Sequence, residues 1–259
     1  MNNPLASSGG IGFFSAHSRK NRKLDLAKIK DLRGSNPVVQ NNKCRFPTEV
    51  RVINLEKRPD RWEKFQGLNK NLFSEFTVTR FNAIEGSNVV DAIFNSFIVC
   101  LEESFKSHET VIIMEDDCYL ATGGLEKLRS SFSDLPEDWD CLIGNHYFIG
   151  EIEILTDHLA RPKNQASSLN FAVFRNTILD KIKNNIDLRS DLLRDIDHFI
   201  TSEKTPINNY TAWPMISREY VSHSDHKNSV KDMTIRIREN AFLYQFVDSD
   251  IYYPSMPEW

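Results

Sequence analysis

The sequence lacks the patterns that are typical of membrane-spanning, secreted and repetitive proteins. No stretch reaches the roughly 18 consecutive apolar residues that a helix needs to cross a bilayer. The first residues, Met1 to Gly12, lack a basic segment followed by an apolar one, so we expect no signal peptide. There is no internal repeat and no coiled-coil pattern. The net charge of −4 also argues against a chain that binds nucleic acid with its whole surface.

The four cysteines do not form a zinc-binding or redox pattern. None belongs to a Cys-x-x-Cys pair, and none has a histidine at the spacing of a zinc ligand. Cys100, Cys118 and Cys141 lie in apolar or strand-like segments, where free cysteines are commonly buried. Together with Cys44, this usage is typical of a reducing compartment, so we expect a cytoplasmic protein.

What the sequence does contain is a sharp change from apolar to acidic residues. Val111 to Met114 are apolar, and Glu115, Asp116 and Asp117 follow at once. The apolar part predicts a short strand that is buried on both faces, as in a parallel sheet. Acids at the carboxyl end of such a strand lie where open α/β sheets bind ligands. Crowded carboxylates are costly to desolvate, which favours a divalent cation; the alternative is a solvated turn or helix start.

The first 48 residues differ from the rest of the chain. Seven basic residues and two acids lie between Arg19 and Arg33. We expect a basic, partly ordered arm over residues 1–48 and one large domain over residues 49–259. Apolar residues between Leu24 and Leu32 predict a short basic helix in the arm. The arm is interpreted either as a contact with an anionic partner or as a solvated segment.

Alternating strands and helices predict an α/β fold, with a largely parallel central sheet and helices on both faces. Strands are expected at 50–55, 76–82, 110–114, 140–143 and 169–174, with an extended segment at 210–216. Helices are expected at 59–68, 88–107, 125–132, 176–184 and 188–202. Trp139, Tyr210 and Trp213 are interpreted as packing residues, with a stacking floor for a sugar or base as the alternative.

Several motifs along residues 50–226 resemble those of the glycosyltransferase family 25 proteins, which include lipooligosaccharide and collagen galactosyltransferases. The first is a strand followed by Asn54-Leu55 and a loop with Arg58 and Arg61, and the run Ile113 to Asp117 is similar to the metal motif of the family. The remaining matches are Phe81–Gly86, Asp138–Asp140, Phe171–Phe174, Ile196-Asp197 and Ser224-Asp225.

This resemblance implies an A-type glycosyltransferase fold in a single catalytic domain. The nucleotide-binding half would span about residues 49–145, and the acceptor half and tail about 146–259. The implied reaction moves a hexose from a UDP-sugar to an acceptor hydroxyl, with Mn²⁺ or Mg²⁺, and inverts the anomeric carbon. The implied acceptor is a lipid-linked or polymeric glycan, for an enzyme that lies at the inner face of a membrane or is encoded by a virus and acts in the host cytoplasm.

The acidic run supplies the expected metal ligands, because a divalent cation offsets the charge that develops on a diphosphate leaving group. Asp117 is the first choice, and Asp116 reaches either the metal or the donor ribose. Glu115 is expected to hold the loop through hydrogen bonds. A later ligand is expected from the segment that contains His223, Asp225 and His226, with the carboxylate preferred because Mg²⁺ and Mn²⁺ favour oxygen.

The loop after the first strand is expected to hold the nucleoside diphosphate. Asn54 and the backbone near Leu55 would address the base, while Arg58 and Arg61 would hold phosphate or carboxylate oxygens through their guanidinium forks. The alternative for Arg61 is a surface ion pair with Asp60 or Glu63.

An inverting transfer needs a base that accepts the proton of the acceptor hydroxyl. Asp195 and Asp197 are the candidates, and because they lie two residues apart they do not share a helix face. The position of Asp197 matches the family pattern. Three other functions stay open: transfer to modified nucleic acid, for which the basic residues 19–33 would provide contacts, a non-catalytic binding domain of the same fold, and a metal-dependent nucleotidyltransferase.

Overall fold

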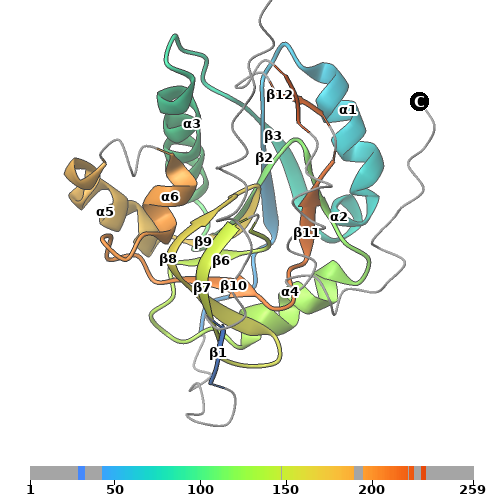
Figure 1. Cartoon of the computed structure of the whole chain (residues 1–259). Coiled ribbons are helices and arrows are strands. Elements are labelled where there is room, and N and C mark those ends of the chain that lie inside the picture. Colours follow the sequence, from blue (N-terminus) through green and yellow to red (C-terminus); the bar gives the residue numbers. More distant parts are fainter. Residues whose placement is uncertain are drawn as a thin grey trace, which may run out of the picture.

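The computed structural model of the protein describes residues 29–32, 43–146, 148–189, 195–220, 222–224 and 229–231. Over these residues, nine strands form one sheet in the order β1-β7-β8-β10-β6-β9-β4-β2-β3 (Figure 1). The strands are β1 (Ile29–Asp31), β2 (Glu49–Asn54), β3 (Thr77–Asn82), β4 (Thr110–Glu115), β6 (Cys141–Ile143), β7 (Phe148–Ile154), β8 (Leu159–Ser167), β9 (Phe171–Arg175) and β10 (Asn209–Ala212).

Most strands of the sheet run in the same direction. β2 is parallel to β3 and β4, β6 is parallel to β10, and β1 is parallel to β7. β9 is antiparallel to both of its neighbours, β4 and β6, and β8 is antiparallel to β10 and β7. Only β8 and β9 of these nine strands are therefore reversed, which confirms the expected α/β class with a mostly parallel sheet.

Helices cover both faces of the sheet, as predicted. Along β4, Ile112 and Met114 belong to one apolar core, and Val111 and Ile113 belong to the core on the other face. This alternation follows from the two-residue period of a strand. The first core is closed by α1 (Pro59–Leu68), α2 (Lys70–Glu75) and α4 (Gly124–Ser133). The second is closed by α3 (Val89–Ser104), α5 (Thr177–Asn184) and α6 (Ile196–Thr201) (Figure 1).

Two small antiparallel sheets accompany the central one. β11 (Ser217–Glu219) pairs with β5 (Cys118–Leu120), and β12 (Ser222–Ser224) pairs with β13 (Ser229–Lys231). The first pair joins the chain just after the acidic run to a segment about 100 residues later in the sequence. A short 3-10 helix (Ile186–Leu188) follows α5.

The structure corrects two predicted helices. Residues 188–202 do not form one helix, because Arg189 and Asp195 have extended backbones and α6 begins only at Ile196. An aspartate at this position is typical of a residue that precedes a helix. Within the predicted helix at 24–32, Ile29–Asp31 is a strand that pairs with β7. Residues 190–194 and the rest of the predicted basic helix lie outside the described residues.

The packing predictions are confirmed where the structure describes them. Cys100, Cys118 and Cys141 are buried free thiols. Trp139, Tyr210 and Trp213 are also buried, which agrees with their interpretation as core residues. Among the described residues, no helix combines the length and the apolar character needed to cross a membrane.

Candidate active site

The strands β2 and β4 end side by side and bring together the first two predicted motifs. Their register pairs Ile53 with Glu115, so Asn54 is adjacent to Asp116 at the carboxyl edge of the sheet. Asn54 is 1% exposed, and its side-chain amide donates one short hydrogen bond to Asp116 Oδ2 and another, of 3.1 Å, to the carbonyl of Arg58. The predicted nucleoside loop and the acidic run therefore form one site.

Arg61 connects α1 to the acidic run. Its Nη2 atom lies 2.6 Å from Asp116 Oδ1 and 2.8 Å from Asp117 Oδ2. The Arg61 side chain is 12% exposed, so this is a buried contact with two acids and not the surface ion pair considered as an alternative. Asp60 is instead bound by Arg58, through two hydrogen bonds of 2.9 Å. Pro59 begins α1, which places Arg61 in its first turn.

Burial and charge oppose each other at these groups. Burial raises the pKa of Asp116 to about 6, and the charge of Asp117 adds to the increase, whereas Arg61 and the hydrogen bond from Asn54 reduce it. For Arg61, burial alone would lower the pKa, but Asp117 and Asp116 raise it above its ordinary value. The guanidinium is therefore cationic at any pH at which the protein is folded, and it neutralises part of the acidic run.

Tyr220 is a site residue that the sequence did not reveal. Its hydroxyl donates to the carbonyl of Asp116 at 2.9 Å, and its backbone N–H donates to the carbonyl of Asp117 at the same distance. The Lys64 ammonium lies 4.1 Å from the centre of its ring. Burial raises the pKa of Tyr220, so the phenol stays protonated and remains a donor. Tyr220 thus attaches the end of β11 to the acidic run.

Glu219, the preceding residue, brings a further acid to the site. β11 and β5 place Glu219 opposite Cys118, and Glu219 is 6% exposed. Glu115, Asp117 and Glu219 each offer a carboxylate oxygen, and these oxygens lie within 4.8 Å of one another. Glu115 therefore belongs to an acidic cluster, in addition to the hydrogen bond of 2.9 Å that its N–H donates to the carbonyl of Asn170.

Asp197 comes to the same edge of the sheet, whereas Asp195 does not enter a comparable contact. Asp197 Oδ2 accepts the N–H of Ser168 at 2.9 Å, and Ser168 has a positive φ of 95°. The segment from Ser168 to Asn170 leads into β9, whose start pairs with the end of β4. Asp195 is exposed, immediately before α6, with its carboxylate 3.8 Å from His198 Nδ1.

The other predicted site residues have different surroundings. The carbonyl of Leu55 accepts hydrogen bonds from Arg58 N at 2.9 Å and from Arg80 Nη2 at 3.0 Å, so this loop is tightly folded. His223 lies in β12, where the structure describes the backbone. Asp225 and His226 lie outside the described residues, so their role as metal ligands stays a prediction.

The strand β6 ends at this edge in a buried polar segment that the sequence interpretation missed. A Cβ atom on Gly144 would lie 2.6 Å from the Phe171 ring and 2.8 Å from Ser217 Oγ, so only glycine fits there without rearrangement. Asn145 accepts a hydrogen bond of 3.2 Å from Ser217. His146 is fully buried, and burial lowers its pKa to about 3, so its imidazole is neutral.

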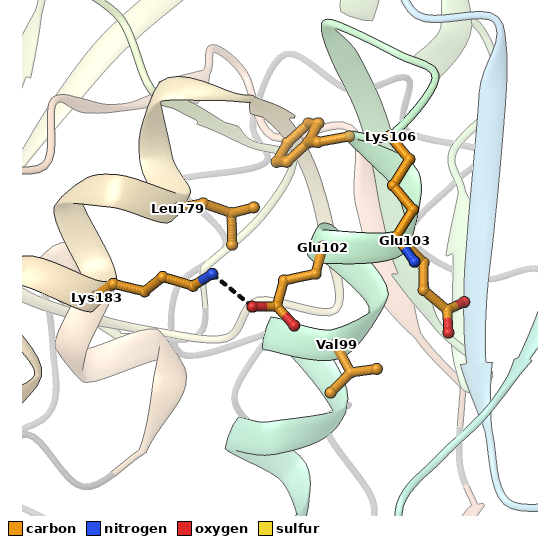
Figure 2. Close-up of a pocket in the computed structure, with 7 residues that line it drawn as sticks. Val99, Glu102, Glu103, Lys106, Leu179 and Lys183 are labelled. Atoms are coloured by element: carbon orange, nitrogen blue, oxygen red, sulfur yellow. Dashed lines mark ion pairs between the residues drawn. The ribbon is translucent and has the colours of Figure 1, made fainter.

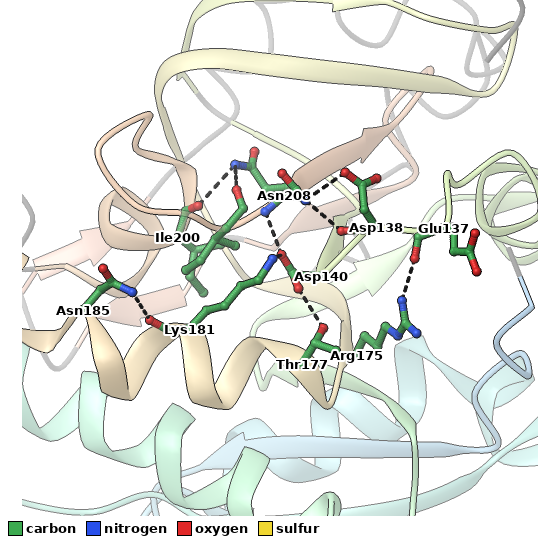
Figure 3. Close-up of polar contacts among 11 residues, drawn as sticks. Glu137, Asp138, Asp140, Arg175, Thr177, Lys181, Asn185, Ile200 and Asn208 are labelled. Atoms are coloured by element: carbon green, nitrogen blue, oxygen red, sulfur yellow. Dashed lines mark hydrogen bonds and ion pairs between the residues drawn. The ribbon is translucent and has the colours of Figure 1, made fainter. Parts of the chain in front are cut away.

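Asp140, from the motif at 138–140, has a structural role. Its buried carboxylate accepts hydrogen bonds from Thr177 Oγ1 at 2.7 Å and Asn208 N at 2.8 Å, and it lies 2.5 Å from Lys181 Nζ (Figure 3). These contacts tie β6 to α5 and to the segment that precedes β10. A carboxylate that is satisfied from three sides stabilises the fold and is not available to a ligand.

A separate pocket lies between α3 and α5. It has a volume of about 450 Å³, and two residues of its lining, Glu102 and Lys183, form an ion pair of 2.6 Å (Figure 2). Its lining includes Val99, in α3, and Phe105, which directly follows α3 on the way to the amino end of β4. The acidic cluster is at the carboxyl end of β4, so this pocket is not part of the candidate site.

The fold and the site define an α/β protein with a buried acidic cluster, the candidate site, at the carboxyl edge of its sheet, where such folds bind ligands. No family model and no curated protein matches the chain.

Three solved structures are similar to parts of this fold. A glycosyltransferase involved in the glycosylation of the major capsid of PBCV-1 is 13% identical and matches with a TM-score of 0.47, covering 77% of this chain and 100% of its own. Protein A197 from STIV is 12% identical, with a TM-score of 0.42, and covers 71% and 93%. A putative glucose-1-phosphate thymidylyltransferase from Bacillus anthracis, in complex with a sucrose, is 11% identical, with a TM-score of 0.31, and covers 86% and 97%. At these values, function has to be argued from the residues of this chain.

Proposed function

We propose that the protein is a metal-dependent glycosyltransferase that moves a hexose from a UDP-sugar to a hydroxyl of an acceptor glycan. One observation carries this proposal: Asn54, Arg61, Asp116 and Asp117 form a single buried contact network at the carboxyl ends of β2 and β4. The residues come from the two motifs that resemble glycosyltransferase family 25, and a nucleotide-sugar site needs both an oxygen-rich cation site and a nucleoside loop.

The nucleoside would lie beside the loop that follows β2. Asp116 is held in place by Asn54 on one oxygen and by Arg61 on the other, so its orientation is determined before a ligand arrives. A carboxylate accepts several hydrogen bonds, and the remaining lone pairs of Asp116 suit a ribose hydroxyl. Asn54 keeps its side-chain carbonyl for the base, since Asn54 Oδ1 accepts no hydrogen bond from a described residue.

The donor set fits a hard divalent cation such as Mn²⁺ or Mg²⁺. Asp117 is 5% exposed, and its Oδ1 atom is buried without a hydrogen-bond partner among the described residues. A buried carboxylate oxygen in this condition is costly unless a cation binds it. When bound, the cation would offset the negative charge that develops on the diphosphate leaving group.

The acceptor side would use Asp197 as the base. Two N–H groups, of Ser168 and His198, donate to its two oxygens at 2.9 and 2.8 Å and orient the carboxylate. In the proposed reaction, the acceptor hydroxyl gives its proton to Asp197 as its oxygen bonds to the anomeric carbon, and the bond to the diphosphate breaks. The inversion follows if attack and departure occur on opposite faces of the sugar.

Two classes of acceptor are considered. Transfer to modified nucleic acid would draw on the basic residues 19–33, of which the structure describes 29–32, in and after β1. A hydroxyl of a lipid-linked or polymeric glycan is the acceptor that we propose, in agreement with the family resemblance.

The test is hydrolysis of UDP-hexoses by the purified full-length protein with and without Mn²⁺, followed by UDP release. We expect Mn²⁺-dependent release with at least one UDP-hexose and a loss of about 100-fold or more in Asp117→Asn, since removing one charge-stabilising group typically costs this much. Glu63→Gln, which removes an exposed acid from α1, is the matched control and should keep full activity.

Two results would replace the proposal. Turnover of a nucleoside triphosphate in the presence of a sugar phosphate, without turnover of UDP-hexoses, would identify a nucleotidyltransferase. Binding of UDP-sugars, seen as a higher melting temperature, without any turnover would identify a non-catalytic binding domain.

A further inference from the structure

We infer that Glu219 is a ligand of the divalent cation, and that the acids of the site are divided between two cations: Arg61 on one side of Asp117, and the metal ion, held by Glu115, Asp117 and Glu219, on the other. This inference rests on the proposed function, because that function is the reason to expect a metal ion at the site. It adds a ligand from β11 that neither the acidic run nor the family resemblance indicates.

The main chain delivers Glu219 to this position. β11 pairs with β5 directly after the acidic run, with Glu219 opposite Cys118. The next residue, Tyr220, is attached twice, through its N–H to the carbonyl of Asp117 and through its hydroxyl to the carbonyl of Asp116, both at 2.9 Å. The three residues of β11 are thus paired with the three residues of β5, and this pairing places Glu219 beside the acidic run.

The distances within the cluster match a single ion. The carboxylate oxygens of Glu115, Asp117 and Glu219 lie within 4.8 Å of one another. Oxygens bind magnesium at about 2.1 Å and calcium at about 2.4 Å, so two ligands on opposite sides of one ion are about 4.2 to 4.8 Å apart. No large movement is needed to close the three carboxylates around a cation.

A second, independent observation concerns Asp117. Its Oδ2 atom is bound by Arg61 at 2.8 Å, while its Oδ1 atom is buried and accepts no hydrogen bond from a described residue. The carboxylate is therefore only half satisfied by the protein. The open half of a carboxylate that is 5% exposed is the natural position for a metal ion, because water reaches it poorly.

The charges lead to the same division. Glu115, Asp116, Asp117 and Glu219 carry four negative charges in a largely buried region, and Arg61 supplies one positive charge to Asp116 and Asp117. Like charges that are buried together destabilise each other. A divalent cation beside Arg61 would offset a further two charges, with Glu115, Asp117 and Glu219 as its ligands.

A second acidic cluster serves as an internal comparison. Asp195, Asp197 and His198 also lie close enough to share an ion. Asp195 is exposed, however, and both oxygens of Asp197 accept backbone N–H groups. We therefore assign no metal to that cluster, and Asp195 offers a matched control.

The test measures Mn²⁺ binding to the full-length protein without nucleotide, from the electron paramagnetic resonance signal of the free ion. We expect Glu219→Gln to weaken binding at least tenfold and Asp195→Asn to leave it unchanged. Without metal, Glu219→Gln should melt at the same temperature as the wild type or higher, because it removes a buried charge and keeps the shape of the side chain.

Three outcomes would overturn the inference: wild-type protein that binds no Mn²⁺, a Glu219→Gln variant that binds it like the wild type, or an Asp195→Asn variant that loses it. If Glu219→Gln melts at a much lower temperature than the wild type without metal, the carboxylate of Glu219 has a structural role. In that case Glu219→Asp, which keeps the charge but has a shorter side chain, should melt like the wild type. Failure of the proposed function is a separate result, namely Glu219-dependent Mn²⁺ binding without turnover of any UDP-hexose.

Discussion

Arg61 Nη2 lies 2.6 Å from Asp116 Oδ1, and the same nitrogen reaches Asp117 at 2.8 Å. One guanidinium from the first turn of α1 thus holds both aspartates that follow β4. The arginine acts as a resident cation of the acidic site: of the phosphate and carboxylate oxygens that the sequence led us to expect as its partners, it contacts carboxylate oxygens. The stability of the metal-free protein should therefore depend on it.

The first prediction is that Arg61→Gln strongly destabilises the protein. Removing one partner from a buried ion pair costs about 3 to 5 kcal/mol, because the remaining charge is left without compensation. Urea unfolding at pH 7 measures this loss, and added Mn²⁺ should reduce it by neutralising the same acids.

The matched control is Arg58→Gln, which removes a guanidinium from the pair with Asp60. The Asp60 side chain is 63% exposed, and exposed pairs contribute about 0 to 1 kcal/mol. Equal losses in the Arg61 and Arg58 variants would show that the buried contact has no special weight.

The two strand ends illustrate how much of the site could be predicted. Asn54 and Asp116 each follow an apolar run, and runs of this type predict parallel strands whose carboxyl ends meet at one edge. Their adjacency is thus a consequence of local patterns. Glu219 and Tyr220 have no such signal, because they reach the site through the pairing of β11 with β5, which joins segments about 100 residues apart.

The same limit applies to the fold. Apolar periodicity predicted β2, β4, α1 and α3 close to their observed bounds, because each buries a regular face. The hairpin of β7 and β8 was not predicted, and the helix at 188–202 was too long. Both lie in the second half of the chain. The helix was predicted too long because an exposed acid such as Asp195 is compatible both with the interior of a helix and with the position before its first residue.

The second prediction concerns the pH dependence of stability. Burial lowers the pKa of His146 to about 3, while an unfolded chain has an ordinary histidine value of about 6.5. The unfolded state therefore binds a proton first as the pH falls. The contribution of the neutral His146 to the free energy of unfolding is therefore complete above about pH 6.5. It falls by about 1.4 kcal/mol for each pH unit between that value and about 3.

Urea unfolding of the wild type and of His146→Gln at pH 7 and pH 5 measures this effect. The wild type should lose more stability than the variant over this interval, by about 2 kcal/mol. His158→Gln, at an exposed position, is the control. A variant with the same loss as the wild type would show that His146 does not control the acid sensitivity.

The third prediction compares two glycines. Gly144→Ala would place a Cβ atom 2.6 Å from the Phe171 ring, and such overpacking typically costs about 1 to 3 kcal/mol. Gly67→Ala, near the end of α1, meets no atom within 4 Å and should stabilise the helix by about 0.5 to 1 kcal/mol. Melting temperatures of the two variants should thus change in opposite directions. A stabilising Gly144→Ala would contradict the packing of β6 against β9.

The fourth prediction separates the two candidate bases. If Asp197 takes the proton of the acceptor hydroxyl, Asp197→Asn should lower kcat for transfer by about 100- to 10,000-fold. Mn²⁺ binding and the KM for the donor should change little, because the acidic cluster at Glu115 and Asp117 is intact. Asp195→Asn should keep most of the activity. The Asp195 side chain is about half exposed, and its contact with His198, at 3.8 Å, is a long one.

Asp197 also supports the turn at Ser168, so a structural role has to be distinguished from a catalytic one. Asparagine keeps an oxygen for one of the two backbone N–H groups and has nearly the same volume, so the fold of the variant should be retained. A catalytic base leaves a second signature: the acid limb of the pH profile of kcat, which reports protonation of the base, should disappear in Asp197→Asn. A variant with a lower melting temperature, an unchanged pH profile and normal kcat per folded molecule would assign Asp197 to the turn and return the role of base to Asp195.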